Sequence, residues 1–252
     1  MSGLALVTGG QQGIGLGIAR QLKGAGFRLA IASRPDRDAL PVQAALGELG
    51  QDTEYFQHDV ADIARIPKLL EDIEARLGAV TTLVSNAGVT TALRDDMLSL
   101  TPENWDFVQN INLRGAFFLA QHVARRMLEQ PSDVYRSILF VTSVSATMVS
   151  PERAEYCISK AAGAMMSQLF AVRLAPHGIG VFELRPGIIA TEMTSGVRDT
   201  YTARIKDGLV PAQRWGEPQD IGEVAAALAT GQMRFANGAS IPVDGGLSIA
   251  RL

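Results

Sequence analysis

Tyr156 and Lys160 are the residues of this chain whose types and spacing best fit a catalytic pair. Side chains four positions apart share one face of a helix, and the Ala-, Met- and Leu-rich segment 154–175 is expected to be helical. A phenol has a pKa near ~10, and a fixed ammonium beside it favours the phenolate and lowers that pKa. The pair could therefore act as a general acid and base at neutral pH. On spacing alone, a packed tyrosine beside a solvated lysine is the commoner explanation.

Two further stretches of the chain could contribute residues to the same site as Tyr156 and Lys160. Ser143 follows the apolar run 137–142, an expected strand, so its hydroxyl would emerge at that strand's carboxyl end. Near the N-terminus, a buried strand at 4–7 leads through the glycine-rich turn 8–15 into a helix at 14–23. Glycines let a phosphate approach the backbone closely, and the positive end of the helix attracts its charge. The spacing is Gly-x-x-x-Gly-x-Gly and not the general dinucleotide fingerprint, so the turn alone does not establish a nucleotide site.

Five motifs follow one another along the chain. They are the TGxxxGxG turn with Thr8, Gly9, Gly13 and Gly15, then Asn86-Ala87-Gly88, Asn112, Ser143, and the YxxxK pair of Tyr156 and Lys160. In type and order these motifs resemble those of the short-chain dehydrogenase/reductase family in its single-domain form. The resemblance extends from about Leu4 to Leu247. It implies a single domain over residues 1–252, built as a doubly wound parallel α/β sheet of the Rossmann-like class.

The resemblance also implies a set of cofactor-binding residues at the carboxyl ends of successive strands. They are Thr8, Gly9, Gln12, Gly13, Ile14 and Gly15 in the turn, Ser33 and Arg34, Asp59 and Val60, Asn86, Ala87 and Gly88, Tyr156 and Lys160, and Pro186, Gly187, Ile189 and Thr191 of a PGxxxT motif. Some of these residues have simpler explanations. An Asp after a strand commonly caps a turn, and Pro-Gly is a turn signal by itself.

Four residues are catalytic by the same resemblance: Asn112, Ser143, Tyr156 and Lys160. Ser143 and Tyr156 would bind a substrate carbonyl, Tyr156 would donate the proton, and the nicotinamide would deliver a hydride. Lys160 would hold the nicotinamide ribose and bias Tyr156 towards phenolate. The Asn112 carbonyl would bend its helix and hold a water that joins Lys160 to solvent.

These roles predict an NAD(P)-dependent oxidoreductase that interconverts a ketone and a secondary alcohol, similar to 3-oxoacyl-carrier-protein reductases. Dehydrogenases of sugars, polyols or other small ketones remain alternatives within the family. The choice depends on side chains such as Ser145, Met148, Val149 and Met193. A cofactor-binding sensor without chemistry is disfavoured, because such proteins usually lose a catalytic residue.

The end of the second strand bears on the choice of cofactor. Enzymes selective for NAD usually carry an acidic residue there, which accepts hydrogen bonds from the adenine ribose. This chain has Ser33-Arg34 instead, and a guanidinium can bind a 2′-phosphate, so NADP is favoured. NAD remains possible, because the glycine turn carries two glutamines and no basic residue, and because Asp36 and Asp38 could neutralise Arg34.

Composition narrows the class of protein. A chain of 252 residues that is 47% hydrophobic can bury one large core, and its formal charge of −3 argues against nucleic acid as the main partner. A single cysteine excludes a disulfide framework, and the three histidines lack the spacing of a metal motif, so no metal is expected. With no secretory signal and no apolar run of ~20 residues, we expect a cytoplasmic protein without a membrane span.

Three longer segments lead to expectations about assembly and about a lid. The helices expected at 116–127 and 154–175 are apolar around much of their circumference, which favours a symmetric oligomer, most simply a homotetramer. The stretch 192–210 is polar and weakly patterned, and its position predicts a lid over the substrate.

Overall fold

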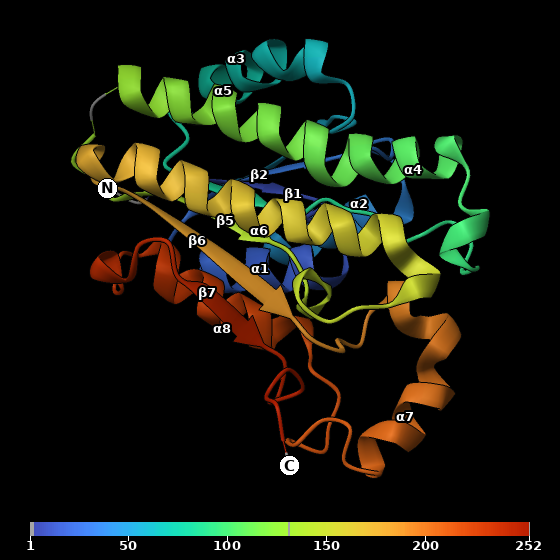
Figure 1. Ribbon diagram of the computed structural model, residues 1–252. Helices are drawn as coiled ribbons and strands as arrows, with labels where there is room; N and C mark the ends of the chain where they lie inside the picture. Colours follow the sequence, from blue (N-terminus) through green and yellow to red (C-terminus); the bar gives the residue numbers. More distant parts are fainter. Residues whose placement is uncertain (1–2, 131, 252) are drawn as a thin grey trace.

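A parallel sheet with helices on both faces forms the body of the protein (Figure 1). The computed structural model describes residues 3–130 and 132–251. The strand order is β3-β2-β1-β4-β5-β6-β7, and each neighbouring pair is parallel. The strands are β1 (Leu4–Thr8), β2 (Arg28–Ser33), β3 (Thr53–Gln57), β4 (Thr82–Ser85), β5 (Arg136–Val141), β6 (Ile179–Pro186) and β7 (Ser240–Val243).

Helices cover the two faces of the sheet in separate groups. One group is α3, α5 and α6, and the other is α1, α2 and α8. Figure 1 shows α3 and α5 above the sheet and α1 and α8 below it. The α-helices are α1 (Gly13–Gly24), α2 (Leu40–Leu49), α3 (Ile66–Leu77), α4 (Pro102–Gln109), α5 (Ala116–Glu129), α6 (Ala154–Leu174), α7 (Arg198–Lys206) and α8 (Pro218–Ala229). A π-helical segment, Asn110–Gly115, joins α4 to α5. This is the doubly wound α/β class that the sequence predicts.

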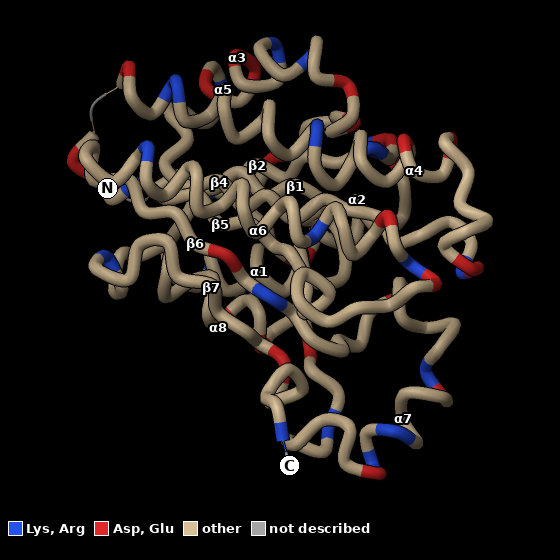
Figure 2. Tube along the Cα trace, in the orientation of Figure 1, with Lys and Arg blue, Asp and Glu red and all other residues tan. Residues whose placement is uncertain are grey.

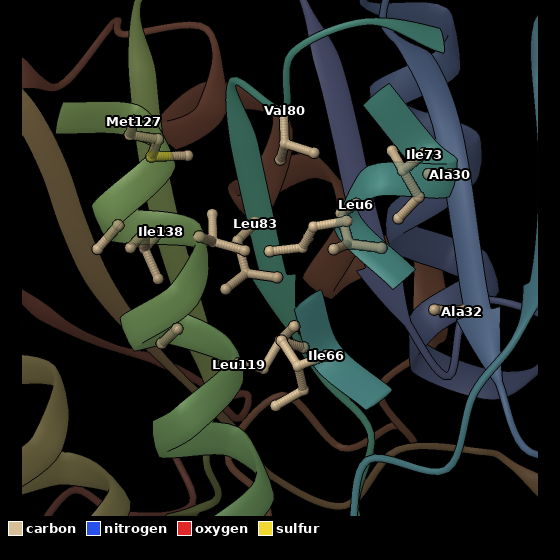
Figure 3. Close-up of a cluster of buried hydrophobic side chains, with 14 of the residues drawn as sticks. Leu6, Ala30, Ala32, Ile66, Ile73, Val80, Leu83, Leu119, Met127 and Ile138 are labelled. Carbon is tan, nitrogen blue, oxygen red and sulfur yellow. The ribbon is translucent and has the colours of Figure 1, made fainter. Parts of the chain in front are cut away.

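Two apolar clusters pack against the two faces of the sheet. Along β1, Leu6 contributes to the cluster under α3 and α5, whereas Val7 contributes to the cluster under α1 and α8. Figure 3 shows the first cluster, in which Leu6 and Leu83 of the sheet meet Ile66 and Leu119 of the helices. Burial on both faces explains why the strands are almost continuously apolar. Each fully buried Leu or Ile contributes about 1.5–3 kcal/mol.

Most element boundaries agree with the sequence pattern. The strand expected at 4–7 is β1, and the apolar run 137–142 corresponds to β5. Helix α3 is preceded by a 3₁₀ turn, Ile63–Arg65, and becomes α-helical at Ile66. Proline lacks a backbone N–H and is tolerated in the first helical turn, which is where α3 carries it. Helix α2 was not expected from the pattern.

Charged residues lie mainly on the helices and loops, and the central strands are nearly free of them (Figure 2). Strand β5 begins with Arg136, and β6 carries Glu183 and Arg185. Glu183 is fully buried, and its carboxylate accepts hydrogen bonds from the Arg185 guanidinium (2.8 Å) and the Thr142 hydroxyl (2.5 Å). This network joins the carboxyl ends of β5 and β6.

Helix α7 stands away from the sheet, beyond the carboxyl ends of the strands (Figure 1). A small third cluster, built on Ile205, Val210 and Leu247, packs it against the rest of the chain. Within this cluster the Trp215 indole donates a hydrogen bond to the Thr202 hydroxyl at 3.1 Å. Segment 192–210 is largely helical. Its role as a lid over the substrate remains a prediction. No helix in the described part of the chain is long and apolar enough to cross a membrane.

Candidate active site

A cavity of about 370 Å³ opens at the carboxyl ends of the strands, where the strand order reverses between β1 and β4. Ligands of open α/β sheets bind at this position. The predicted site residues that line it are Thr8, Gly9, Gln12, Gly13, Ile14, Gly15, Ser33, Arg34, Asp59, Val60, Asn86, Ala87, Gly88, Tyr156, Lys160 and Thr191. The predicted residues outside its lining are Asn112, Ser143, Pro186, Gly187 and Ile189.

A larger cavity of about 480 Å³ lies elsewhere, between β7 and the segment that follows α7. It shares no lining residue with the first. Its one cationic lining side chain, Arg214, is engaged in paired hydrogen bonds with Asp220, both at 2.8 Å. The larger cavity is lined by no Tyr, no Lys and no Ser–His or Cys–His pair. The first, smaller cavity is therefore the candidate active site.

The glycine turn forms a cradle for an anionic group. Gly9 and Gly13 have φ angles of 66° and 53°, a region that side chains disfavour. A Cβ on Gly15 would lie 2.1 Å from the Gly9 carbonyl oxygen, so no larger residue fits there. The first turn of α1 carries no acidic residue, and the side chain of its N-cap, Gln12, makes no capping hydrogen bond. The helix N-terminus can therefore accept the pyrophosphate of a dinucleotide.

Thr8 and Asn86 lock the ends of β1 and β4 together at the floor of the cavity. The Thr8 hydroxyl accepts hydrogen bonds from the backbone N–H groups of Asn86 (3.0 Å) and Ala87 (2.9 Å). The Asn86 amide in turn donates to the Thr8 carbonyl at 2.8 Å. Each side chain thus binds the backbone of the other segment and fixes the floor of the cavity.

At the end of β2 the two predicted specificity residues differ in their surroundings. The Ser33 hydroxyl is buried and lies 2.9 Å from the Tyr55 hydroxyl, so it is already engaged. Arg34 is exposed and forms no ion pair within the described residues. The carboxylate of Asp36 accepts a hydrogen bond from the Gln57 amide (2.7 Å), which also donates to the Arg34 carbonyl (3.2 Å).

Tyr156 and Lys160 lie one helical turn apart on α6 and both face the cavity. The Lys160 Nζ lies 5.6 Å from the centroid of the Tyr156 ring and donates to the Val141 carbonyl at 3.2 Å. The Arg153 guanidinium carbon lies 5.5 Å from the same ring. Two cations thus surround the phenol ring, and a backbone carbonyl at the end of β5 fixes one of them.

Ser143 lies just beyond the cavity lining, next to Thr142, which is part of it. Its hydroxyl oxygen accepts a hydrogen bond from the Ser145 N–H (3.0 Å) and caps the short 3₁₀ turn Val144–Ala146. The hydroxyl proton of Ser143 remains available to a ligand, since accepting this bond does not use it. The Glu183–Thr142 hydrogen bond holds the preceding residue.

Asn112 lies in the π-helical segment and is only 7% exposed. Its side-chain oxygen accepts from the Val89 N–H (2.8 Å), and its amide donates to the Val89 carbonyl (2.9 Å) and the Ser159 hydroxyl (3.1 Å). The irregular helix agrees with the bend expected at Asn112. The side chain itself clamps the loop after β4 to α6, a role that the sequence did not indicate, and the water-binding role of its carbonyl stays a prediction.

The PGxxxT motif contributes mainly through its backbone. Ile189 is 3% exposed and packs into the core under α1 and α8. A Cβ on Gly187 would lie 2.7 Å from the Asp244 Cα, so this glycine permits close packing against the segment after β7. Only Thr191 reaches the cavity, where its methyl carbon would lie 3.5 Å from a Cβ on Gly13.

Several lining residues were not in the predicted set. They are Gln11, Ala32, Pro35, His58, Val89, Ile111, Val141, Thr142, Glu192 and Met193. Most of them adjoin a predicted residue in sequence, which is the signal that could have identified them. Burial lowers the pKa of His58, although Asp62 and Asp59 oppose that shift. The His58 Nε2 and the Gln11 Oε1 have no hydrogen-bond partner within the described residues.

A cradle for pyrophosphate and a Tyr–Lys pair in the same cavity define a dinucleotide-dependent oxidoreductase. A family model described as "Enoyl-(Acyl carrier protein) reductase" matches residues 9–248. The chain belongs to the short-chain dehydrogenase/reductase family, as its motifs predicted, and it is an NAD(P)-dependent oxidoreductase.

Three relatives illustrate the similarity. The 3-oxoacyl-[acyl-carrier-protein] reductase of Staphylococcus epidermidis is 32% identical over 249 residues, which are 98% of this chain and 99% of the relative. A crystal structure of 3-oxoacyl-[acyl-carrier protein] reductase from Brucella melitensis in complex with NAD is 46% identical, with a TM-score of 0.96 over 100% of this chain and 99% of that one. A gluconate 5-dehydrogenase from Burkholderia cenocepacia in complex with NADP and tartrate is 31% identical, with a TM-score of 0.90 over 100% and 97%. Relatives therefore bind NAD or NADP.

Proposed function

We propose that this protein reduces the ketone group of a 3-oxoacyl compound to a secondary alcohol with NAD(P)H. The observation that carries the proposal is that Tyr156 and Lys160 line the same cavity as the glycine turn. A hydride donor held by the turn and a proton donor from the protein would then meet in one cavity.

The turn from Gly9 to Gly15 and the N-terminus of α1 would hold the pyrophosphate of the cofactor. The cofactor would supply a hydride for the substrate carbon. Lys160 would bind the nicotinamide ribose, and its Nζ lies 5.6 Å from the centroid of the Tyr156 ring. Tyr156 gives its proton to the carbonyl oxygen, while Ser143 donates a hydrogen bond to the same oxygen. The reverse reaction returns that proton to Tyr156.

Apolar side chains near the site support an acyl substrate. Val149 is 91% exposed and Met148 39%, both on the segment between Ser143 and Tyr156, and Met193, which lines the cavity, is 58% exposed. Exposed apolar groups beside a cavity gain free energy when an alkyl chain covers them, whereas a sugar would bring hydroxyl groups that these side chains cannot bind. The similarity to 3-oxoacyl-carrier-protein reductases supports the same substrate class.

We also propose that the enzyme prefers NADP to NAD. Arg34 lies exposed on the cavity lining at the end of β2, where NAD-selective enzymes usually carry an acidic residue. Ser33 contributes less than its sequence position indicates, because Tyr55 already binds its hydroxyl.

The test is a screen of the purified protein with NADPH and with NADH, following the absorbance of the reduced nicotinamide. The substrates are acetoacetyl thioesters, diketones, sugars and polyols. The expected result is the fastest turnover with a 3-oxoacyl thioester. Faster turnover of a sugar or polyol would identify the protein as a sugar or polyol dehydrogenase instead. A protein that binds the cofactor but reduces none of these carbonyls would overturn the proposed reaction.

A further inference from the structure

Glu155 is a buried acidic residue that the proposed mechanism does not use. It immediately precedes Tyr156 in the first turn of α6 and is only 2% exposed. The Thr91 hydroxyl, whose single proton is shared between the Leu93 carbonyl (2.8 Å) and the Glu155 carboxylate, is within the described residues the carboxylate's one side-chain partner. No cation pairs with it there. Burying a carboxylate in this way costs stability, so its presence points to a role in the site.

Thr91 belongs to the loop that forms one wall of the cavity. Gly88 and Val89 line the cavity, and Thr91 follows two residues later, 7% exposed. A Cβ on Gly88 would lie 3.5 Å from the Lys160 Nζ, which places this wall beside the catalytic lysine. Asn112 holds the loop at Val89, and Glu155 holds it at Thr91.

The backbone of Glu155 is held as well. The Gln109 side-chain amide at the end of α4 donates to the Glu155 carbonyl at 2.9 Å. Figure 1 shows α4 beside the start of α6. The turn that carries Tyr156 is thereby connected to α4 through Gln109 and to the cavity wall through Thr91.

We propose that Glu155 is a positioning residue. Its hydrogen bond to Thr91 fixes the wall segment 88–91 against the turn that carries Tyr156. It therefore sets the position of the nicotinamide half of the cofactor relative to the phenol. The adenosine half lies at the ends of β2 and β3, among residues that make no contact with this bond. Since Tyr156 is catalytic here only through the proposed function, the role of Glu155 rests on that function too.

The experiment compares Thr91→Val, which removes the hydroxyl and keeps the shape, with Thr91→Ser, which keeps the hydroxyl. The binding of NADPH and of 2′-phospho-ADP-ribose, which lacks the nicotinamide, is measured by calorimetry. We expect Thr91→Val to weaken NADPH binding about 10-fold and to leave the fragment within about 2-fold, because a hydrogen bond to a charged group is lost at one end of the cavity only. Thr91→Ser should bind both ligands as the wild type does.

The role of Glu155 itself is tested with Glu155→Leu, alone and combined with Thr91→Val. In the double variant the loss of NADPH affinity should be no greater than in the worse single variant, because both changes break one bond. The matched control is Glu152→Gln, an exposed carboxylate close by in sequence, which should change nothing. If Thr91→Val does not fold, Glu155→Leu carries the same comparison of the two ligands.

Two results would overturn the positioning role. One is equal binding by Thr91→Val and Thr91→Ser, and the other is an equal loss of NADPH and fragment affinity, which would mean a general loosening of the fold. Neither measurement needs a substrate. A wild-type protein that binds NADPH and reduces no ketone would therefore refute the proposed function alone. The affinities of the variants for NADPH and for the fragment would still test the role of Glu155.

Discussion

Arg34→Ala is the substitution that most directly tests cofactor choice. Arg34 is exposed and forms no ion pair within the described residues, so its removal leaves no unpaired carboxylate behind and should not affect folding. A hydrogen bond to a charged group is worth about 1.5–3 kcal/mol. Solvent screens an exposed pair, so the lower end of that range applies. Since about 1.4 kcal/mol is a factor of ten, kcat/KM for NADPH should fall about 10-fold.

The assay measures kcat/KM with NADPH and with NADH for the same carbonyl substrate. Arg34→Ala should change the value for NADH by less than about 2-fold, since no charged contact with that cofactor is lost. Arg37→Ala is the matched control, because Arg37 is an exposed arginine of the same loop whose guanidinium lies 3.4 Å from the Tyr55 carbonyl oxygen. Equal losses of kcat/KM with both cofactors, or a wild-type enzyme that prefers NADH, would show that Arg34 does not bind the 2′-phosphate.

The remaining predictions concern the catalytic pair, assembly and pH. Tyr156→Phe should lower kcat by about 10²-fold or more and retain cofactor affinity, whereas Lys160→Ala should lower both kcat and cofactor affinity. Full activity of Tyr156→Phe would refute the role of Tyr156 as the acid. Light scattering should report a homotetramer, because α6 exposes an apolar stripe that includes Leu169, 60% exposed, and Val172, 79% exposed; a monomer at micromolar concentration would exclude this. Burial lowers the pKa of His58 in the folded protein. As the pH falls, the unfolded chain therefore protonates His58 before the folded protein does. The free energy of unfolding should decrease as the pH falls below ~6.5, the usual pKa of histidine. His58→Asn should reduce that slope in denaturant titrations, and an unchanged slope would contradict it.

Local sequence was sufficient for the parts of the site that depend on backbone geometry. Gly9 and Gly13 adopt positive φ angles, which depend only on the local turn, so the pattern of glycines was sufficient to predict that turn. The i, i+4 spacing of Tyr156 and Lys160 likewise fixes their relation within one helix. The buried strands could be predicted because burial on both faces leaves a short, continuous apolar run.

The sequence was insufficient where a role depends on a partner far along the chain. Ser33 has the position of a cofactor ligand, yet a tyrosine from the next strand binds its hydroxyl. Ile189 lies inside a family motif, but its side chain fills the core. The contact between Thr91 and Glu155 joins residues 64 positions apart, and neither residue type indicates the other. Contacts of this kind arise from the packing of elements, which composition and spacing do not specify.

The small separate cluster beneath α7 has a consequence for how the enzyme could change its substrate. Ile205, Val210 and Leu247 anchor α7 and the segment after it without belonging to either large core of the sheet. Substitutions in this region should therefore alter stability little, whereas substitutions under the glycine turn would disturb the whole domain. If segment 192–210 covers the substrate as predicted, natural divergence or laboratory selection for a new ketone can act on it while the nucleotide site stays constant. An expected lid with its own anchor would make substrate range an independently evolvable property of this fold.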